Sequence, residues 1–140
     1  MSTPHYILDT DIASYAIKGR TSTVDAMLTV VGITQVCISA VTRAELVYGI
    51  QVLPALHKIH RSTRRFLTEV TVIPWGADAA DAYAEIRHRL KSSGRPIGDR
   101  DTMIAAHAIS LGAVLVSNNM RHHARLSPPL DLENWAIAKA

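Results

Sequence analysis

Short apolar runs alternate along the chain with longer segments in which apolar residues recur every three or four positions. The short runs have the length and residue types of buried strands, and the longer segments have helical periodicity. Strands are predicted at residues 5–8, 35–39, 70–73, 113–117 and, as a closing edge strand, 130–132. Helices are predicted at residues 12–17, 23–31, 41–48, 53–69, 78–93 and 102–111. This alternation predicts an α/β protein with a parallel sheet of four to five strands flanked by helices.

Length and composition are those of one ordinary globular domain. The 140 residues are enough to bury a core, and we expect a single domain spanning residues 1–140. Hydrophobic residues make up 48% of the chain and charged residues 19%, which excludes a disordered protein. The only cysteine, Cys37, lies in an apolar run and is predicted to be a buried thiol. No signal-peptide pattern and no run near the roughly 20 apolar residues of a membrane span are found, so we expect a cytoplasmic protein without membrane contact.

The charge balance permits a polyanionic partner without requiring one. Lys and Arg number 15 against 12 Asp and Glu, a formal net charge of +3. The most basic segment is the predicted helix at residues 53–69, which is expected to turn Leu56 and Phe66 inward and several Arg and His residues outward. A solvated face is the simpler interpretation of its basic side, and contact with phosphates is the alternative.

Polar side chains follow three of the predicted strands. Asp9 follows the first strand, Ser39 ends the second, and Ser117 and Asn119 end and follow the fourth. In an open parallel sheet these positions share one edge, which is where ligands bind. Asp11 is the candidate cap of the next helix, whereas Asp9 is predicted to have no capping role because it finishes a buried strand.

A third acid is predicted in an apolar helix. Glu45 is surrounded in sequence by Ala44, Leu46 and Val47, and burying an unpaired charge costs several kcal/mol. Its partner is therefore Arg43, another basic group or a metal ion, unless the side chain is exposed.

Two more carboxylates lie at the predicted start of the last long helix. Pro96 and Gly98 exclude a helix through them, so the helix begins near Asp99 or Arg100 and holds Asp101 in its first turn. The simpler interpretation makes Asp99 an N-cap and Asp101 an acid that complements the helix dipole. The alternative is a metal site.

Three acids near hydroxyl and amide groups form an oxygen-rich site. Such ligands suit Mg²⁺ or Mn²⁺ and do not suit zinc, and the carboxylates would repel one another without a cation. A water on Mg²⁺ can be activated to attack a phosphate. The residues alone therefore indicate a metal-dependent phosphoryl or phosphodiester hydrolase.

Four motifs in order resemble the PIN-domain ribonuclease toxins of the VapC type. They lie at residues 7–12, 37–49, 94–108 and 115–119, and the closing segment 132–135 also resembles that family. The resemblance covers essentially the whole chain. It implies a PIN-like fold in which Mg²⁺, with Mn²⁺ as a substitute, is bound and water is activated by three acids: Asp9, Glu45 and Asp101.

The resemblance also assigns supporting residues. Ser39 and Ser117 would orient a carboxylate or the scissile phosphate, and Asp99 is an extra ligand at best. Asn119 stands where many members have a fourth acid, and Asp11 stands where Asn is commoner. Because an amide brings no charge, one-metal chemistry is expected.

The function implied by the resemblance is that of a toxin. It would cleave RNA, either tRNA or another structured RNA, and so inhibit translation. It would form a homodimer, and a cognate antitoxin would neutralise it by covering the acidic cleft, commonly with a basic side chain inserted.

Two other functions remain open at this point. A haloacid-dehalogenase-like Mg²⁺ phosphatase would use Asp9 as a phosphorylated nucleophile and Asp11 as its acid and base, but it leaves Glu45 without a role. A non-catalytic nucleic-acid-binding module of the same fold would need none of the acids for chemistry.

Overall fold

The described residues form one parallel sheet. The structure is a computed structural model that describes residues 4–94, 97–126 and 129–137. The strands are β1 (Tyr6–Leu8), β2 (Val36–Ser39), β3 (Thr71–Ile73), β4 (Val114–Val116) and β5 (Asp131–Glu133), in the spatial order β3-β2-β1-β4-β5. All neighbouring pairs are parallel, which confirms the predicted sheet. The edge strand β5 lies one residue later than predicted.

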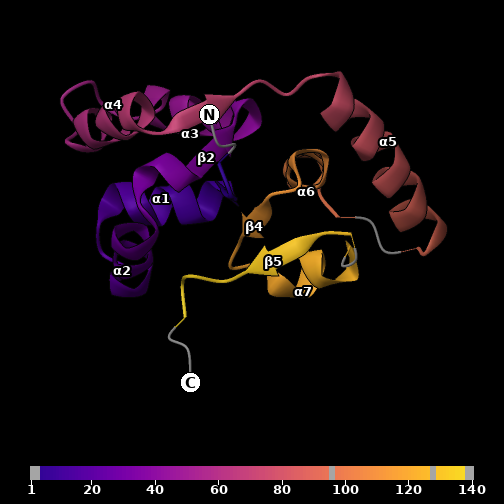
Figure 1. Ribbon diagram of the computed structural model, residues 1–140. Coiled ribbons are helices and arrows are strands. Elements are labelled where there is room, and N and C mark those ends of the chain that lie inside the picture. The colour runs from indigo at the N-terminus through magenta and orange to yellow at the C-terminus, as the bar shows by residue number, and fades with distance from the viewer. Residues whose placement is uncertain (1–3, 95–96, 127–128, 138–140) are drawn as a thin grey trace.

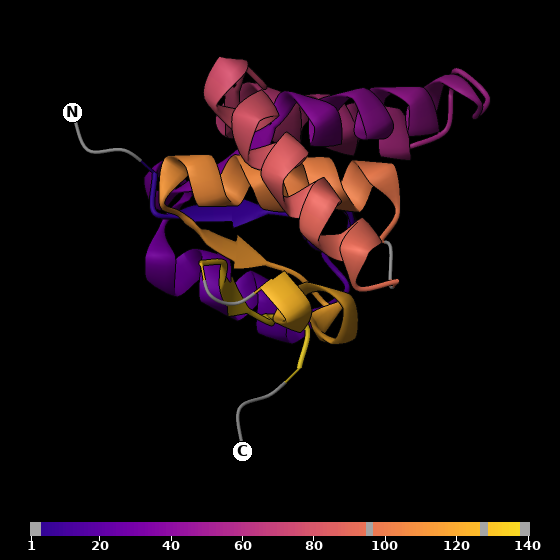
Figure 2. The same ribbon diagram turned by 90° about the vertical axis from the view of Figure 1, so that its right-hand side faces the viewer.

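Helices cover both faces of the sheet (Figure 1). They are α1 (Thr10–Lys18), α2 (Ser22–Val31), α3 (Ala40–Gln51), α4 (Ile59–Glu69), α5 (Ala77–Ser92), α6 (Asp99–Leu111) and α7 (Met120–His123), with 3-10 turns at Ile33–Gln35 and Ala124–Leu126. Helices α5 and α6 lie on one face, and Figure 2 shows α5 crossing over α6, which runs along the sheet. Helices α1, α2 and α4 pack on the other face. Among these helices none is long and apolar enough to cross a membrane.

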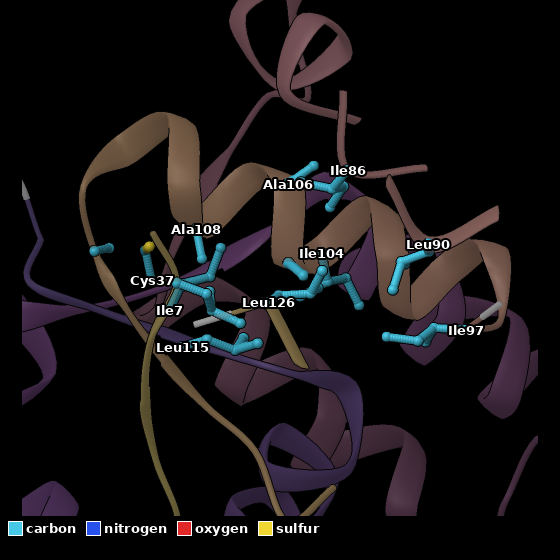
Figure 3. Packing of buried hydrophobic residues seen from close by; sticks show 13 residues of the cluster. Ile7, Cys37, Ile86, Leu90, Ile97, Ile104, Ala106, Ala108, Leu115 and Leu126 are labelled. Atoms are coloured by element: carbon cyan, nitrogen blue, oxygen red, sulfur yellow. The ribbon is translucent and has the colours of Figure 1, made fainter. Parts of the chain in front are cut away.

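Alternate residues of each central strand supply two separate cores, because successive side chains of a strand point to opposite faces. Ile7 of β1 and Leu115 of β4 pack with Ile86, Leu90 and other residues on the α5 and α6 side (Figure 3). Cys37 lies in the same core, as predicted, and burial raises the pKa of its thiol to about 12.

The opposite face holds the second core. Leu8, Ile38 and Val116, one residue along each strand, pack there with Phe66 of α4 and with Trp135. Both faces of the central strands are therefore dry, which explains why these strands are continuous apolar runs in the sequence.

The helix predicted at residues 53–69 is wrong in its first part. Helix α4 begins at Ile59, and the segment after α3 turns instead, with the Leu53 N–H donating to the Ile50 carbonyl. Pro54 has no N–H to continue a helix. Leu56, predicted to face inward, is 98% exposed, whereas Phe66 is buried as predicted.

Three further details of the helices were not predicted: the end of α3, the presence of α7 and the cap of α6. Helix α3 continues through Gly49 to Gln51, and α7 was not predicted, since four residues carry too little periodicity to be recognised. Helix α6 begins at Asp99 with Gly98 as its cap residue, so Asp99 is not the predicted N-cap. Pro96 lies outside the described residues.

The strand order creates a crevice at the carboxyl end of β1. From β1 the chain first builds β2 and β3 on one side, and it later adds β4 and β5 on the other. The connections that follow β1 and β4 therefore lead to opposite sides of the sheet. Open α/β sheets bind ligands at such a switch point in strand order. Asp9 and Ser117 follow these two strands directly.

Truncating a core side chain of β4 tests this packing. Leu115→Ala is expected to lower the free energy of unfolding by about 2–5 kcal/mol, because it leaves a cavity between the sheet and α6. Leu56→Ala makes the same chemical change at an exposed position and should cost less than about 0.5 kcal/mol. Urea denaturation of both variants measures the difference, and equal losses would contradict the packing described here.

Candidate functional site

Asp9 joins β1 to α1 and serves both elements. Its N–H donates to the Val116 carbonyl over 3.0 Å, and its Oδ1 accepts from the Ile12 N–H at 2.9 Å as the N-cap of α1. The prediction that Asp9 has no capping role is therefore wrong. Asp11, predicted to be the cap, instead lies exposed in the first turn of α1.

Burial and neighbouring acids make the Asp9 carboxylate costly to ionise. The residue is 5% exposed, and burial is the main reason why its pKa is raised to about 6. Hydrogen bonds from the Ser117 hydroxyl and the Ile12 N–H lower the pKa, whereas the charges of Asp11 and Asp101 raise it further. Asp9 thus faces two other acids at the crevice.

Asp101 approaches Asp9 from the first turn of α6. It is half-buried, and its pKa is raised first by burial and then by Asp11, while His122 and Arg100 lower it. The helix N-terminus leaves free N–H groups near this carboxylate. Asp9, Asp11 and Asp101 therefore concentrate negative charge at the carboxyl end of β1.

Glu45 lies beside this group on α3. The Thr10 hydroxyl donates to its Oε1 at 2.6 Å, and Arg100 Nη1 lies 3.5 Å from its Oε2. The Glu45 side chain is 23% exposed and that of Arg100 is 71% exposed. The basic partner of Glu45 is therefore Arg100 and not Arg43, which lies nearer in the sequence.

The two predicted serines are fully buried at the ends of their strands. Ser39 Oγ accepts from the Val41 N–H at 3.1 Å, which caps α3, and it also lies 2.8 Å from Nδ1 of His107. Ser117 Oγ accepts from the Asn119 N–H at 2.9 Å and its hydroxyl bonds to Asp9. Ser117 thus touches an acid of the site, whereas Ser39 fixes the start of the helix that carries Glu45.

His107 is a structural partner that the sequence did not single out. It is buried in α6, and burial lowers its pKa, so the neutral ring faces Ser39. The contact ties α6, which carries Asp101, to the end of β2. No local sequence signal links residues 68 positions apart.

The remaining supporting residues lie at the edge of the site. Asp99 is exposed, its Oδ1 lies 3.4 Å from the Tyr83 hydroxyl, and it lines an open pocket of about 420 Å³ with Glu45, Arg100 and Asp101. The Asn119 side-chain amide donates to Nδ1 of His122 at 2.9 Å.

The acids fit a largely hydrated magnesium ion better than a closed metal cage. In the parts of the chain that the structure describes, no three His, Cys, Asp or Glu side chains are close enough to hold a metal together. Mg²⁺ commonly takes one or two protein carboxylates and keeps several waters. Asp9 and Asp101 could meet that need, and a cation there would offset the burial, and to a smaller extent the repulsion between acids, that raises both pKa values.

Sequence reasoning did not identify two residues that contact Glu45 and one whose charge influences Asp101. Thr10 bonds to Glu45, Arg100 pairs with it, and the charge of His122 reaches Asp101. Thr10 and Arg100 each stand beside two acids in sequence, which is the one signal that could have marked them. The position of His122 depends on α7, which was not predicted.

The chain matches a known protein family over most of its length. Residues 6–126 match the model of the family described as PIN domain. The chain belongs to the PIN-domain family. It is 34% identical over 131 residues to the tRNA(fMet)-specific endonuclease VapC of Shigella flexneri, a match that covers 94% of this chain and 98% of that protein. It is 35% identical over 131 residues to Ribonuclease VapC2 of Rickettsia felis, covering 93% and 97%.

Solved PIN-domain structures agree with the fold. The DNA-bound VapBC structure from Salmonella typhimurium superposes with a TM-score of 0.87 and 31% identity, covering 95% of this chain and 99% of that chain. The resemblance to VapC-type PIN ribonucleases that the sequence motifs carried is confirmed. The match also decides against the haloacid-dehalogenase-like phosphatase.

Neutralising Asp9 should stabilise the metal-free PIN domain at neutral pH. Because the folded-state pKa lies near 6, above the ordinary value of 3.8, native Asp9 binds protons more tightly than unfolded Asp9. The wild type therefore loses stability as pH rises from about 4 through about 6. Asp9→Asn removes the charge and keeps a capping oxygen, so we expect a gain on the order of 2 kcal/mol at pH about 8 in EDTA.

The control is Asp9→Ala, which removes the charge and the cap together. It should be less stable than Asp9→Asn by about 1 kcal/mol. The gain of Asp9→Asn should disappear below pH about 4, where Asp9 is protonated in both states. Thermal or urea unfolding at the two pH values measures these effects, and a gain that does not change with pH would contradict the assignment.

Proposed function

We propose that this chain is a single PIN domain, residues 1–140, that acts as a Mg²⁺-dependent endoribonuclease toxin. One observation carries the proposal: Asp9 and Asp101, two acids with raised pKa values, meet at the sheet crevice of a chain that matches VapC ribonucleases over nearly its full length. The reaction is hydrolysis of an RNA phosphodiester bond. Divalent metal ions are general cofactors of PIN-domain nucleases.

The chain's own residues would hold the metal as follows. Asp9 and Asp101 are the proposed direct ligands, and Glu45 is the third acid, bound directly or through a water. When bound, Mg²⁺ supplies a water of lowered pKa and stabilises charge on the phosphate oxygens. Mn²⁺ is the proposed substitute, since it shares the preference for oxygen ligands. Asp11 and Asp99 add negative charge at the rim.

The other polar groups would orient these acids. Ser117 donates to Asp9 and holds its carboxylate toward the crevice, and Thr10 fixes one oxygen of Glu45. The other Glu45 oxygen faces Arg100 and would accept a proton from the attacking water once that guanidinium has moved away. Ser39 supports the site through the cap of α3, and Asn119 occupies its edge without adding charge, which favours one-metal chemistry.

The proposed substrate is tRNA or another structured RNA, whose cleavage would inhibit translation. Support comes from the relatives named as tRNA(fMet)-specific endonucleases. RNA that serves translation lies in the cytoplasm, which is therefore the proposed location. The outward face of α4 carries exposed Arg61, Arg64 and Arg65 and offers phosphate contacts.

The proposed protein partners are a second copy of the chain and a cognate antitoxin. The structural relatives are VapBC toxin-antitoxin complexes. A pocket of about 290 Å³ runs from Glu45 along α1, α3 and α4 and is lined by Leu46, Ile50 and Leu53. Tyr48 on α3 and Val52, directly after α3, are both exposed. An antitoxin helix with apolar anchors and one cation would suit this pocket.

Replacing Asp101 tests whether the acids carry the chemistry. Asp101→Asn is expected to reduce Mg²⁺-dependent cleavage of tRNA by at least about 100-fold, because a metal ligand loses its charge. Asp78→Asn is the matched control, since Asp78 is also an acid in the first turn of a helix but lies on α5, away from the site. Cleavage is followed on denaturing gels with purified protein, and full activity of Asp101→Asn would contradict the site.

The same variant separates the enzyme from a non-catalytic binding module. Expression of the wild type should arrest growth, expression of Asp101→Asn should not, and co-expression of the antitoxin should relieve the arrest. If RNA binding and growth arrest are both unchanged by the substitution, the function is not catalytic.

Metal exchange tests the cofactor. EDTA should abolish cleavage, and added Mg²⁺ or Mn²⁺ should restore it, because both accept the oxygen ligands of this site. Zn²⁺ should restore little, since it prefers nitrogen and sulfur ligands and the three acids supply only oxygen. Efficient cleavage in EDTA, or recovery with Zn²⁺ alone, would show that the acids do not hold a hard cation.

A further inference from the structure

Arg100 is the one basic side chain found in contact with Glu45 among the described residues. It is the second residue of α6 and stands between Asp99 and Asp101 in the sequence. Its guanidinium reaches across to α3, with Nη1 3.5 Å from Glu45 Oε2. The same cation also lowers the pKa of Asp101. Arg100 therefore partly neutralises two of the three acids assigned to the metal.

Helix formation does not account for this arginine. A positive charge in the first turn of a helix is disfavoured by the helix dipole. The side chain is 71% exposed, so little apolar surface is buried by it, and an exposed pair at 3.5 Å contributes only weakly to stability. Its position is explained better by the acids that it faces.

The ion pair between Arg100 and Glu45 can open, so that another cation can replace Arg100. Arg100 cannot lose its proton at any physiological pH, so its charge leaves Glu45 only when the side chain moves. It lines the open pocket shared with Glu45 and Asp101, and the exposed guanidinium has room to turn there. Its five N–H donors match phosphate oxygens, which are the groups that RNA would bring to this pocket.

We propose that Arg100 is an exchangeable counter-ion: it holds Glu45 in the metal-free site and binds an RNA phosphate once a divalent cation has taken its place. The inference rests on the proposed nuclease function. It adds a substrate-binding residue that also sets the strength of metal binding. Arg100 and the divalent cation compete for Glu45, and Arg100, once displaced, turns toward the substrate.

The first measurement is metal affinity without RNA. Mn²⁺ binding to purified full-length protein is followed by electron paramagnetic resonance. Arg100→Gln should bind Mn²⁺ up to about fivefold more tightly than the wild type, the range of an exposed ion pair. Arg43→Gln removes the same charge from an exposed position two residues from Glu45 and should change the affinity less than about twofold.

A double substitution assigns the effect to Glu45. In a Glu45→Gln background the additional change Arg100→Gln should no longer tighten Mn²⁺ binding, because the carboxylate that the arginine holds is gone. Persistence of the full effect in that background would overturn the counter-ion role.

The second measurement is steady-state cleavage of tRNA at several salt concentrations. Arg100→Gln should raise KM severalfold with a smaller change in kcat, and it should lower the slope of log KM against log salt by about 0.7 to 0.9, the contribution of one phosphate contact. Arg100→Lys keeps the charge and should recover part of the loss. An unchanged KM and slope would overturn the phosphate contact.

The outcomes separate this inference from the proposed function. If the wild type binds Mn²⁺ and Asp101→Asn weakens that binding, the metal site stands, and equal affinity of Arg100→Gln and wild type then overturns the role of Arg100 alone. If the wild type binds no Mn²⁺, the proposed function fails with it. A lower urea midpoint for Arg100→Gln without tighter Mn²⁺ binding would make the pair a structural tie and overturn the proposal.

Discussion

The structure depends on an anionic side chain at the end of its central buried strand. Asp9 follows β1, which has a neighbour on each side and a core on each face, so its carboxylate is almost fully removed from water. Two hydrogen bonds offset part of that cost, and the nearby charges of Asp11 and Asp101 add to it. Keeping this carboxylate ionised costs the fold local stability, and the proposed bound cation would relieve that cost.

This constraint connects the fold to the chemistry. One oxygen of Asp9 starts α1 by accepting from Ile12, so the same residue orders the helix that presents Thr10 to Glu45. Ser117 follows β4 and donates to Asp9, so the switch in strand order is what supplies this hydrogen bond. The acids are therefore held by elements that fold only together, and they reach the crevice already oriented.

The hydrophobic pattern of the sequence was sufficient to predict the strands of the sheet. Both faces of β1, β2 and β4 are buried, so each of these strands is a continuous apolar run in the sequence. Contacts between distant elements had no such signal. The pair between Glu45 and Arg100 depends on how α3 and α6 cross, and the contact between Ser39 and His107 depends on the same crossing. The start of α4 is predicted too early, because a proline is tolerated in the first turn of a helix and Pro54 therefore does not exclude a helix from residue 53.

The acids also differ in role for a physical reason. Asp9 and Asp101 are withdrawn from water and close to like charges, so they gain most from a cation between them. Glu45 is less buried than Asp9, and both of its oxygens already face a partner, a hydroxyl and a guanidinium. This environment suits the role proposed for Glu45, a group that would take a proton from water, better than the role of a metal anchor. These differences in environment agree with the proposed arrangement, in which Asp9 and Asp101 hold one metal ion and Glu45 assists.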